Sequence, residues 1–426
     1  MALKDFIGRL LAPAIENYLT GQFGTLKGKT HSGEVVTDDS PFQNPAVRAA
    51  IQRIAYDIAV TPLKVVSQTD GTRKEQRKHP LYALLTSAPN ARMTAFELKV
   101  AWMVWLLTWG NAYTYIERDA NGRPMGLWPL RSDRMRVFID PSNREMVYEY
   151  TPTTAEGDVQ MFAQSEILHL KGLSSDGLVG RPPMADMREK LGELQAVERM
   201  SQSFYGNGMR SQGVLKTDTT MSAAAADRLK LQLDDRRGAG EAWKTLLLEE
   251  GVDYKELTFP PEQAQLLQTR EFGVLDVCRW FNLRPYILGV NSAGSMSYNS
   301  VEIQQLDHNQ ATLRPWAVNI EQAIDRACIK SEERAAGVHV EFNLDANLRA
   351  DTKTRYEAHQ VALRNGILTL DEVRDIEGRN PYPDGIGAEP RITLDVAVPT
   401  DDPPEPPDAP PEVPEPADSA DPDASA

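Results

Sequence analysis

The part of this 426-residue chain that most constrains its fold lies between Pro260 and Gly337. The apolar pattern there predicts a helix from Glu262 to Phe281 and then a second, longer helix that contains Pro315. The Gly-, Ser- and Asn-rich residues 289–300 separate the two helices, and this link exceeds the roughly two to eight residues that usually join helices. A long, soft loop between two firm helices is therefore predicted.

Apolar residues of the longer helix recur at spacings of three, four and seven, so they share one face. They are Ile303, Leu306, Leu313, Ala317, Ile320, Ile324 and Cys328. Asn299 is its predicted cap, and the helix is predicted to run to about Arg334, roughly 50 Å at 1.5 Å per residue. Pro315 lacks an N–H and its ring presses on the carbonyl of Ala311, so a bend is predicted there. Such an element suits holding a loop in place better than it suits an enzyme core.

The chain before this segment has the order helix, insert, helix. Arg181-Pro-Pro183 opens a helix from Met184 to Phe204, and a small α/β insert occupies residues 211–261. The helix at Glu262 then leads back. Two helices that lead out to an insert and return predict a stalk with a tip.

Residues 41–183 read as an α+β module. Its first helix is predicted to be capped by Asn44, and a capping box at Thr94-Ala-Phe-Glu97 opens an apolar helix that stops at Gly110. The tryptophans of that helix are interpreted as packing residues; they are Trp102, Trp105 and Trp109. Residues 1–40 are predicted to be a flexible N-terminal segment.

After Gly337 the pattern predicts a strand, a helix from Asp351 to Arg364, and a short helix opened by a capping box at Thr369-Leu-Asp-Glu372. Residues 399–426 are acidic and Pro-rich, with nine Asp or Glu and no Lys or Arg, and are predicted to be disordered. The whole chain has a net charge of −15, which leaves −6 for the remainder. Such a body has no broad basic face to hold phosphates tightly, although it can touch or enclose DNA.

Composition also indicates the cellular compartment in which the protein is expected. Cys278 and Cys328 both fall on apolar helix faces, which predicts buried free thiols and fits a reducing cytosol. The most apolar stretch, Val100 to Trp109, is about half of the ~20 residues that a membrane span needs, and no signal peptide is recognised.

A search for catalytic chemistry finds little. No phosphate-binding loop, nucleophile elbow or histidine pair with metal-ligand spacing is present in the sequence, so no catalytic residue, metal or cofactor is expected. Asp345 and Asp351 remain as a rival metal site for an enzyme acting on nucleic acid, although helix capping explains Asp351 more simply. A cytosolic scaffold that binds partners through its acidic tail is another alternative. The basic run Arg73–Lys78 is interpreted as solvated hairpin charge, with DNA or an acidic partner as the minority alternative.

Several short motifs, taken together and in order, resemble the portal proteins (head–tail connectors) of tailed double-stranded DNA phages. The similarity covers about residues 40–390. The motifs are His79-Pro-Leu-Tyr-Ala-Leu-Leu, Pro89-Asn90, Met93-Thr94, Gly110-Asn-Ala-Tyr113, Ile167-Leu-His169, Asp176-Gly-Leu-Val-Gly180, Phe204-Tyr-Gly-Asn-Gly208, Gly213-Val-Leu215, Leu313-Arg-Pro315, Gly366-Ile-Leu-Thr369 and Glu372-Val-Arg374.

The resemblance implies an α+β, portal-type fold. Between the two terminal segments, its implied parts are a wing (41–183), stem helices (184–210 and 262–288), a clip (211–261), a tunnel loop (289–300), a kinked wing helix with a strand (301–350) and a helical crown (351–398). The positions implied to line a DNA channel are Val290, Asn291, Ser292, Ser295, Met296 and Tyr298. The clip positions expected to contact terminase are Asp234, Asp235, Arg236 and Arg237.

The family also implies a function without catalysis. A ring, expected to be a homododecamer, sits at one capsid vertex, admits double-stranded DNA driven by a separate terminase motor, releases it later and joins head to tail. The expected partners are further copies of the chain, the terminase large subunit, the major capsid protein or scaffold, a head-completion or adaptor protein, and DNA without sequence specificity. The expected location is the virion, with the host cytoplasm during assembly; no cofactor and no membrane contact are expected.

Overall fold

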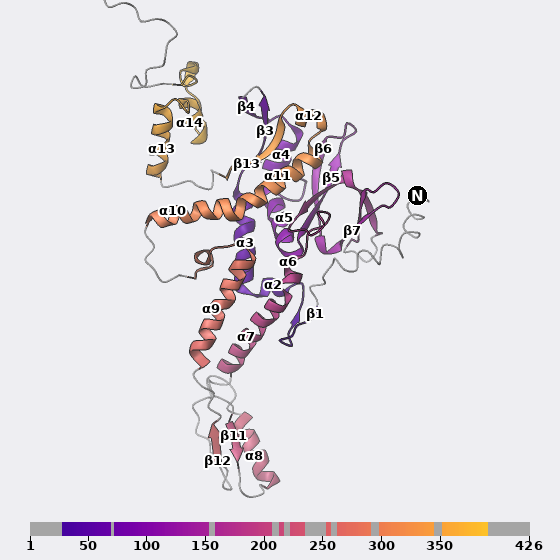
Figure 1. Ribbon diagram of the computed structural model, residues 1–426, viewed down its shortest axis with the longest axis vertical. Coiled ribbons are helices and arrows are strands. Elements are labelled where there is room, and N and C mark those ends of the chain that lie inside the picture. Colours follow the sequence, from indigo (N-terminus) through magenta and orange to yellow (C-terminus); the bar gives the residue numbers. More distant parts are fainter. Residues whose placement is uncertain are drawn as a thin grey trace, which may run out of the picture. The chain divides into compact units, whose positions relative to one another are not determined.

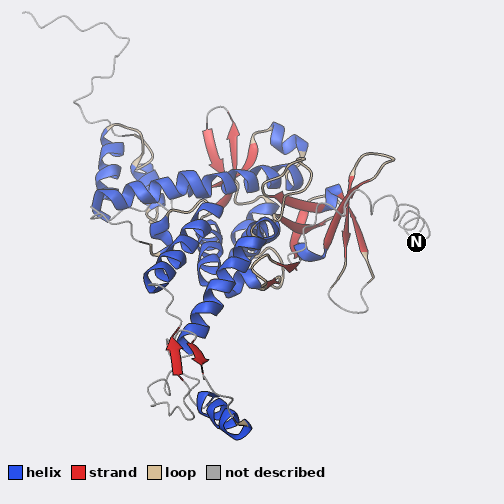
Figure 2. Ribbon diagram, turned by 60° about the horizontal axis from the view of Figure 1, so that its bottom comes forward, coloured by secondary structure: helices blue, strands red, loops and turns tan. Residues whose placement is uncertain are grey.

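The computed structural model describes the backbone of residues 28–69, 72–152, 158–206, 213–216, 222–234, 253–256, 262–290, 298–344 and 352–390. The chain divides into two compact units, Met1–Leu348 (unit 1) and Arg349–Ala426 (unit 2). Unit 1 combines helices with small antiparallel sheets (Figure 1, Figure 2), and this mixture confirms the predicted α+β class.

Helices α3 (Pro45–Val60) and α5 (Ala95–Trp109) pack together at the centre of unit 1 (Figure 1). The predicted caps are confirmed. The Asn44 side chain accepts hydrogen bonds from two N–H groups of the first turn of α3, and Thr94 and Glu97 form the capping box of α5. Gly110 ends α5 with φ of 70°, in the left-handed region that glycine adopts without strain.

The tryptophans of α5 pack as predicted. Trp102 is fully buried, and its indole N–H donates to Oγ1 of Thr114 at 2.7 Å. Trp105 and Trp109 are partly buried against the same core. Because a buried indole N–H needs an acceptor, Thr114 explains how Trp102 is accommodated.

Three three-stranded antiparallel sheets surround these helices. Their spatial orders are β10-β5-β6, β13-β3-β4 and β7-β8-β9. The strands are β3 (Leu63–Thr69), β4 (Thr72–Glu75), β5 (Asn111–Arg118), β6 (Pro124–Leu130), β7 (Met135–Ile139), β8 (Met146–Tyr150), β9 (Gln160–Ala163), β10 (Ile167–Lys171) and β13 (Val338–Phe342). The short helical elements beside them are α4 (Pro80–Thr86), η1 (Ser132–Arg134) and η2 (Gln164–Glu166).

Strand β13 joins the two ends of unit 1, because it pairs with β3 although the strands are far apart in sequence. Two carboxylates of helix α11 (Arg314–Cys328) cover its other edge. The backbone N–H of Val340 donates to Asp325 Oδ1 at 2.8 Å, and that of Phe342 donates to Glu321 Oε1 at 2.7 Å. Burial raises the pKa of both carboxyls. These contacts satisfy donors of an edge strand that would otherwise be open.

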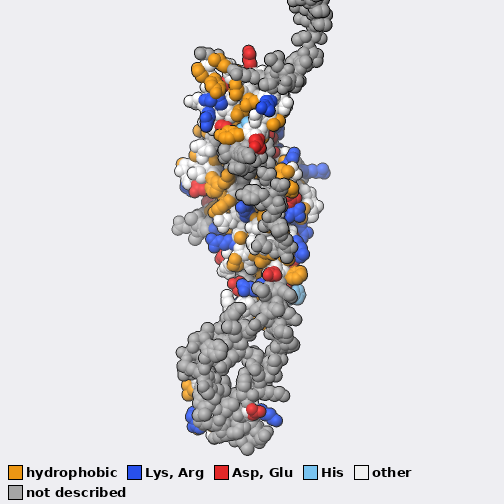
Figure 3. Space-filling view, turned by 90° about the vertical axis from the view of Figure 1, so that its left-hand side faces the viewer, with side chains coloured by type: hydrophobic (Ala, Val, Ile, Leu, Met, Phe, Trp, Pro, Cys, Tyr) orange, Lys and Arg blue, Asp and Glu red, His pale blue; other side chains and the backbone are white. Residues whose placement is uncertain are grey.

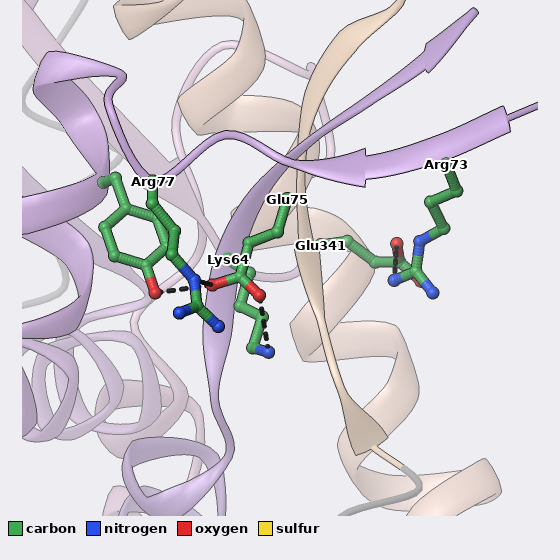
Figure 4. Close-up of polar contacts among 6 residues, drawn as sticks. Lys64, Arg73, Glu75, Arg77 and Glu341 are labelled. Carbon is green, nitrogen blue, oxygen red and sulfur yellow. Dashed lines mark hydrogen bonds and ion pairs between the residues drawn. The ribbon is translucent and has the colours of Figure 1, made fainter. Parts of the chain in front are cut away.

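Two of the four cationic residues in the basic run at the β3–β4 hairpin, Arg73 and Arg77, form ion pairs (Figure 4). Arg73 contacts Glu341 of β13 at 2.6 Å, and Glu75 lies among the donors Lys64, Arg77 and Tyr82. Burial raises the pKa of Glu75, but the three hydrogen bonds outweigh it and lower the pKa from 4.5 to about 2. This pairing favours ordinary hairpin charge over a dedicated phosphate-binding patch.

The long helix differs from its prediction at both ends. Helix α10 (Tyr298–Asp307) begins one residue before the predicted cap Asn299, which therefore lies inside the helix. A π-helical turn, η4 (His308–Leu313), connects α10 to α11. The helix ends at Cys328 rather than near Arg334, because Ile329 is extended and buried, and a separate helix α12 (Ser331–Ala335) follows.

The predicted flexibility of residues 1–40 is wrong for residues 28–40, while residues 1–27 lie outside the described chain. Strands β1 (Gly28–Lys29) and β2 (Val35–Val36) form a hairpin that packs on helix α7 (Arg188–Gly206), and α2 (Ser40–Gln43) follows. Thr30 fits over Gly192, where a Cβ would lie 2.4 Å from its hydroxyl. The nearly buried Glu34 also pairs with Arg199 at 2.7 Å. These contacts between distant segments have no local sequence signal.

The predicted helix 184–204 is interrupted. Helix α6 (Pro183–Asp186) ends at Met187, where ψ is −2°, and α7 starts at Arg188. Met184, Met187 and Leu191 are all buried in the main core. The interruption therefore turns three apolar side chains into the core before α7 leads away from it.

Candidate functional site

The strongest candidate site is the mounting of the predicted loop. Helix α9 (Glu262–Trp280) and the 3-10 turn η3 (Pro285–Leu288) lead to Val290, and α10 begins at Tyr298. Tyr298 is therefore helical rather than part of the loop. The other predicted channel residues, Asn291, Ser292, Ser295 and Met296, lie outside the described residues.

Three polar contacts fasten the segment before the loop to the helix after it, and they are called the ladder here. Its contacts are Asn282 to Ala311, Arg284 to Asp307, and Tyr286 to Gln304. Residues two apart on one side meet residues three or four apart on the other. The partners occur in opposite order along the two segments, so the segments run antiparallel. The two spacings match the different repeats of a non-helical or 3-10 segment and of a helix, so all three contacts form in one register.

The first contact uses the backbone that Pro315 leaves free. Asn282 Nδ2 donates to the carbonyl of Ala311 at 2.9 Å, and Thr312 Oγ1 donates back to the Asn282 carbonyl at 2.7 Å. In a regular helix Ala311 would accept from residue 315, but proline has no N–H. Asn282 adopts φ of 52°, which asparagine tolerates better than most residues.

The second contact is electrostatic. The Arg284 guanidinium donates to both carboxylate oxygens of Asp307, at 2.6 and 2.8 Å. The hydrogen bonds that Arg284 donates to Asp307 hold the pKa of Asp307 below its usual value and raise the pKa of Arg284. Both groups face solvent, so added salt weakens this pair.

The third contact lies nearest the loop. Tyr286 donates its hydroxyl to the carbonyl of Gln304 at 2.9 Å. Beyond it, Gly289 closes η3 with φ of 79°, and the N–H of Val290 donates to the carbonyl of Pro285 at 3.1 Å. The chain is thus held up to the last described residue before the loop.

A buried polar contact anchors the π-helical turn to the core. His308 is 5% exposed, and its Nε2 lies 2.9 Å from Asp57 Oδ2 on α3. The same oxygen accepts from Arg53 Nε at 2.7 Å. Leu313, at the other end of the turn, is buried in the main core. The ladder is therefore attached to α3 as well as to the end of α9.

A second junction brings together three of the sequence motifs. The Asn111 amide accepts from Gly180 N–H and donates to the Gly180 carbonyl, both at 2.7 Å, and also contacts His169 Nε2 at 2.9 Å. A Cβ at Gly110 would lie 1.9 Å from the Arg181 carbonyl oxygen, and one at Gly180 would lie 2.0 Å from the Gly110 carbonyl oxygen. Burial lowers the pKa of His169 well below its usual value. This junction fixes the loop that leads into α6.

The two predicted stem helices contact each other. Lys190 on α7 pairs with Asp276 on α9 at 2.6 Å. Gly273 provides a close approach, because a Cβ there would lie 2.6 Å from a methyl group of Leu194. Cys278, on α9, is buried as predicted, as is Cys328.

The predicted insert is described only in part. Strands β11 (Gly213–Lys216) and β12 (Asp253–Glu256) pair antiparallel, and Ser222 caps helix α8 (Ala223–Asp234) by accepting from the Ala225 N–H at 3.3 Å. Asp234 is the last residue of α8. Asp235, Arg236 and Arg237 lie outside the described residues.

The rival metal site cannot be placed, because Asp345 and Asp351 both lie outside the described residues. Across the described ranges, there is no cluster of three or more His, Cys, Asp or Glu side chains suited to a metal ion. Over the same ranges no helix has the length and apolarity of a membrane span.

An α+β body, two helices flanking an α/β insert, and a loop mounted on an irregular long helix together define a portal-type subunit. The chain belongs to the phage portal protein family, whose model matches residues 45–378. The portal protein of Enterobacteria phage HK97 is 29% identical over 382 residues, which cover 89% of this chain and 88% of that protein. The predicted resemblance is thus confirmed.

Two solved structures share the fold. An HK97-family phage portal protein from Corynebacterium diphtheriae matches with a TM-score of 0.55 and 18% identity, over 74% of this chain and 98% of that one. A chain from the neck of a native gene transfer agent particle with C12 symmetry matches with a TM-score of 0.53 and 22% identity, over 81% and 92%. By its family the chain is a portal protein of the tailed-phage type, and this family consists of structural components of the virion.

Sequence reasoning missed the residues that mount the loop. Asn282, Asp57 and His308 were not singled out, although the missing N–H of Pro315 was. A proline inside a long helix predicts a spare carbonyl at the fourth residue before it. Which distant side chain uses that carbonyl depends on tertiary packing.

Proposed function

We propose that copies of this chain close into a ring, of twelve subunits, that forms the passage for double-stranded DNA at one capsid vertex. Segment 290–297 lines the channel as the tunnel loop, and the ladder keeps its ends in place while DNA moves past. The ladder is the observation that carries this proposal. The twelvefold symmetry named for the related neck supports the subunit number.

The chemistry of the loop suits a moving polyanion. The proposed channel residues, five in the loop and one at the start of α10, are uncharged; they are Val290, Asn291, Ser292, Ser295, Met296 and Tyr298. Affinity for DNA rises steeply with the number of cationic contacts. An uncharged loop therefore lets the duplex slide without strong electrostatic binding and without sequence preference.

The remaining parts follow the family plan. Residues 41–183 are the wing, residues 184–210 and 262–288 the stem, residues 211–261 the clip and residues 351–398 the crown. The clip meets the terminase large subunit during packaging and a head-completion or adaptor protein afterwards, and the body contacts the major capsid protein or scaffold. The protein acts in the host cytoplasm during assembly and then in the virion, joining head to tail.

Native mass spectrometry and end-on negative-stain images test the ring. We expect closed rings of about twelve copies, in line with the cyclic symmetry common to such assemblies, with a central opening. Monomers and dimers alone, across a range of salt and protein concentration, overturn the proposal. So do rings with the loop on the outer perimeter.

The loop is tested by adding positive charge. Rings carrying Ser292→Lys and Ser295→Lys should package DNA more slowly at low salt, because each lysine adds a phosphate contact, and should recover as salt rises. Gln160→Lys, at an exposed position of β9, is the matched control. Equal packaging rates for all rings contradict a channel-lining role for the loop.

Clip contact is tested by charge reversal at Asp234, Asp235, Arg236 and Arg237. Reversal should weaken binding of the terminase large subunit while rings persist, because like charges then meet across the contact. Binding measured on preassembled rings separates the two effects. Undiminished binding in all four variants rules out this part of the proposal.

A further inference from the structure

Unit 2 is held together by polar contacts. Its described helices are α13 (Thr352–Arg364) and α14 (Leu370–Ile376), with the 3-10 turn η6 (Pro383–Gly385) after them. Glu377 accepts from Arg355 at 3.0 Å and contacts His359 at 3.1 Å, which ties the end of α14 to α13. The predicted capping box at Thr369 is present.

The same unit lacks an apolar interior. Among its described side chains, none of the large hydrophobic residues is buried. The most exposed are Ile367 (71%), Ile386 (58%), Val361 (57%), Ile376 (49%), Tyr356 (47%) and Tyr382 (43%). Hydrophobic side chains of this unit are open to solvent near the top of Figure 3. Helix α3 of unit 1, by contrast, buries its whole apolar face.

The described part of unit 2, the 39 residues from 352 to 390, is too small to supply the missing core alone. Below about 40 residues, domains usually need disulfides, metals or oligomerisation to be stable. Both cysteines lie in unit 1, and no metal-binding cluster occurs among the described residues. Association is the remaining route, and exposed apolar patches of this kind mark interaction surfaces.

The charges of the two helices indicate the partner. Helix α13 has three cationic residues against one acidic residue, namely Lys353, Arg355 and Arg364 against Glu357. Helix α14 has the reverse, Asp371, Glu372 and Asp375 against Arg374. The two helices therefore have opposite net charge. A contact between α13 of one copy and α14 of another is electrostatically favourable, and such a head-to-tail contact can repeat around a ring.

We propose that α13 of each copy packs against α14 of the next copy, so that the hydrophobic core of unit 2 is completed between subunits. The inference rests on the proposed ring, in which the same unit of the neighbouring copy lies at the same height along the axis. It adds that unit 2 reaches its stable packing only on assembly. Val361 on α13 and Ile376 on α14 are the exposed apolar residues expected in the contact.

Hydrogen exchange of full-length protein tests the coupling between assembly and packing. Amides of residues 352–390 should exchange at least about tenfold more slowly in rings than in dissociated monomers. Val361→Asp and Ile376→Asp should each abolish that difference, because a carboxylate in an apolar contact is strongly disfavoured. Val159→Asp is the matched control, since Val159 is an exposed valine (54%) of unit 1. Equal exchange in wild-type rings and monomers overturns the inference.

Cysteine crosslinking tests the direction of the contact. A chain with both Val361→Cys and Ile376→Cys should give a series of covalent multimers on oxidation, while either single variant stays monomeric in a denaturing gel. The native cysteines are buried and should not react. Dimers from a single variant would mean that like helices meet, and that result refutes the head-to-tail contact. If the wild type forms rings but the double cysteine variant gives no covalent multimers, this inference alone is refuted. If the wild type forms no rings, the proposed function is refuted as well.

Discussion

Replacing Asn282 separates the two physical contributions of the first ladder contact. Asn282→Gly removes the side-chain hydrogen bond to Ala311 but suits φ of 52°. Asn282→Ala removes the same hydrogen bond and keeps a Cβ in the left-handed conformation, but without the polar side chain that makes asparagine tolerant of it. The bond from Thr312 to the backbone carbonyl is available in both variants. The comparison therefore isolates backbone strain from side-chain bonding.

The expected magnitudes differ enough to be measured. Loss of one hydrogen bond costs about 0.5–1.5 kcal/mol. In the left-handed region alanine costs roughly 1–2 kcal/mol more than glycine. Because about 1.4 kcal/mol is a factor of ten, local opening should rise roughly two- to tenfold for the glycine variant and at least about tenfold for the alanine variant.

Hydrogen exchange of residues 298–313 in assembled rings measures this opening. Asn143→Ala, at an exposed asparagine in the β7–β8 turn, is the control and should leave these amides unchanged. If both Asn282 variants exchange like the wild type, the ladder does not hold the helix that carries the loop. If the glycine variant is as perturbed as the alanine variant, the assignment of strain to this residue is wrong.

Three further outcomes are expected. Gly180→Ala should lower the free energy of unfolding by more than about 3 kcal/mol, because its Cβ meets a backbone carbonyl at 2.0 Å. Gly122→Ala meets no neighbouring atom and adds only the backbone strain of φ +74°, so it should lower the melting temperature less. The pKa of Glu75 is lowered from 4.5 to about 2, so its stabilising contribution is present above pH 4.5 and is lost as the pH falls towards 2. Glu75→Gln should therefore reduce the loss in urea midpoint between pH 5 and pH 3, and an unchanged loss contradicts this account. Amide hydrogen exchange near the loop should be faster in Arg284→Ala than in the wild type at low salt and equal to it at high salt, since the ion pair of Arg284 with Asp307 is exposed. A difference that does not depend on salt argues against an ionic contact.

Local chemistry was predictable from the sequence, and long-range packing was not. The caps at Asn44, Thr94 and Thr369 follow from side chains within three residues of the N–H groups that they satisfy, and all three are present. The hairpin over residues 28–36 depends on contacts with α7, more than 150 residues away. Its own composition, with Gly, Lys and Thr, resembles a loop. Flexibility was therefore the reasonable but wrong prediction.

The candidate site was predicted in part, for the same reason. The long loop and the irregular helix followed from Pro315 and from the Gly- and Ser-rich composition. The contacts of Asn282 and His308 needed the fold, because their partners lie about 30 and 250 residues away. The length of the helix was overestimated because no glycine or proline marks a helix end between Cys328 and Gly337, whereas the buried Ile329 is extended and separates α11 from α12.

Pro315 links these observations. A proline inside a helix releases one carbonyl, and a π-helical turn next to it widens the helix at that place. Here the released carbonyl of Ala311 binds Asn282 at the end of α9, so a bond normally internal to one helix joins two elements instead. The turn is also fixed to α3 through His308 and Asp57. Displacement of the helix that follows the loop is therefore opposed by the end of α9 and by the main core together.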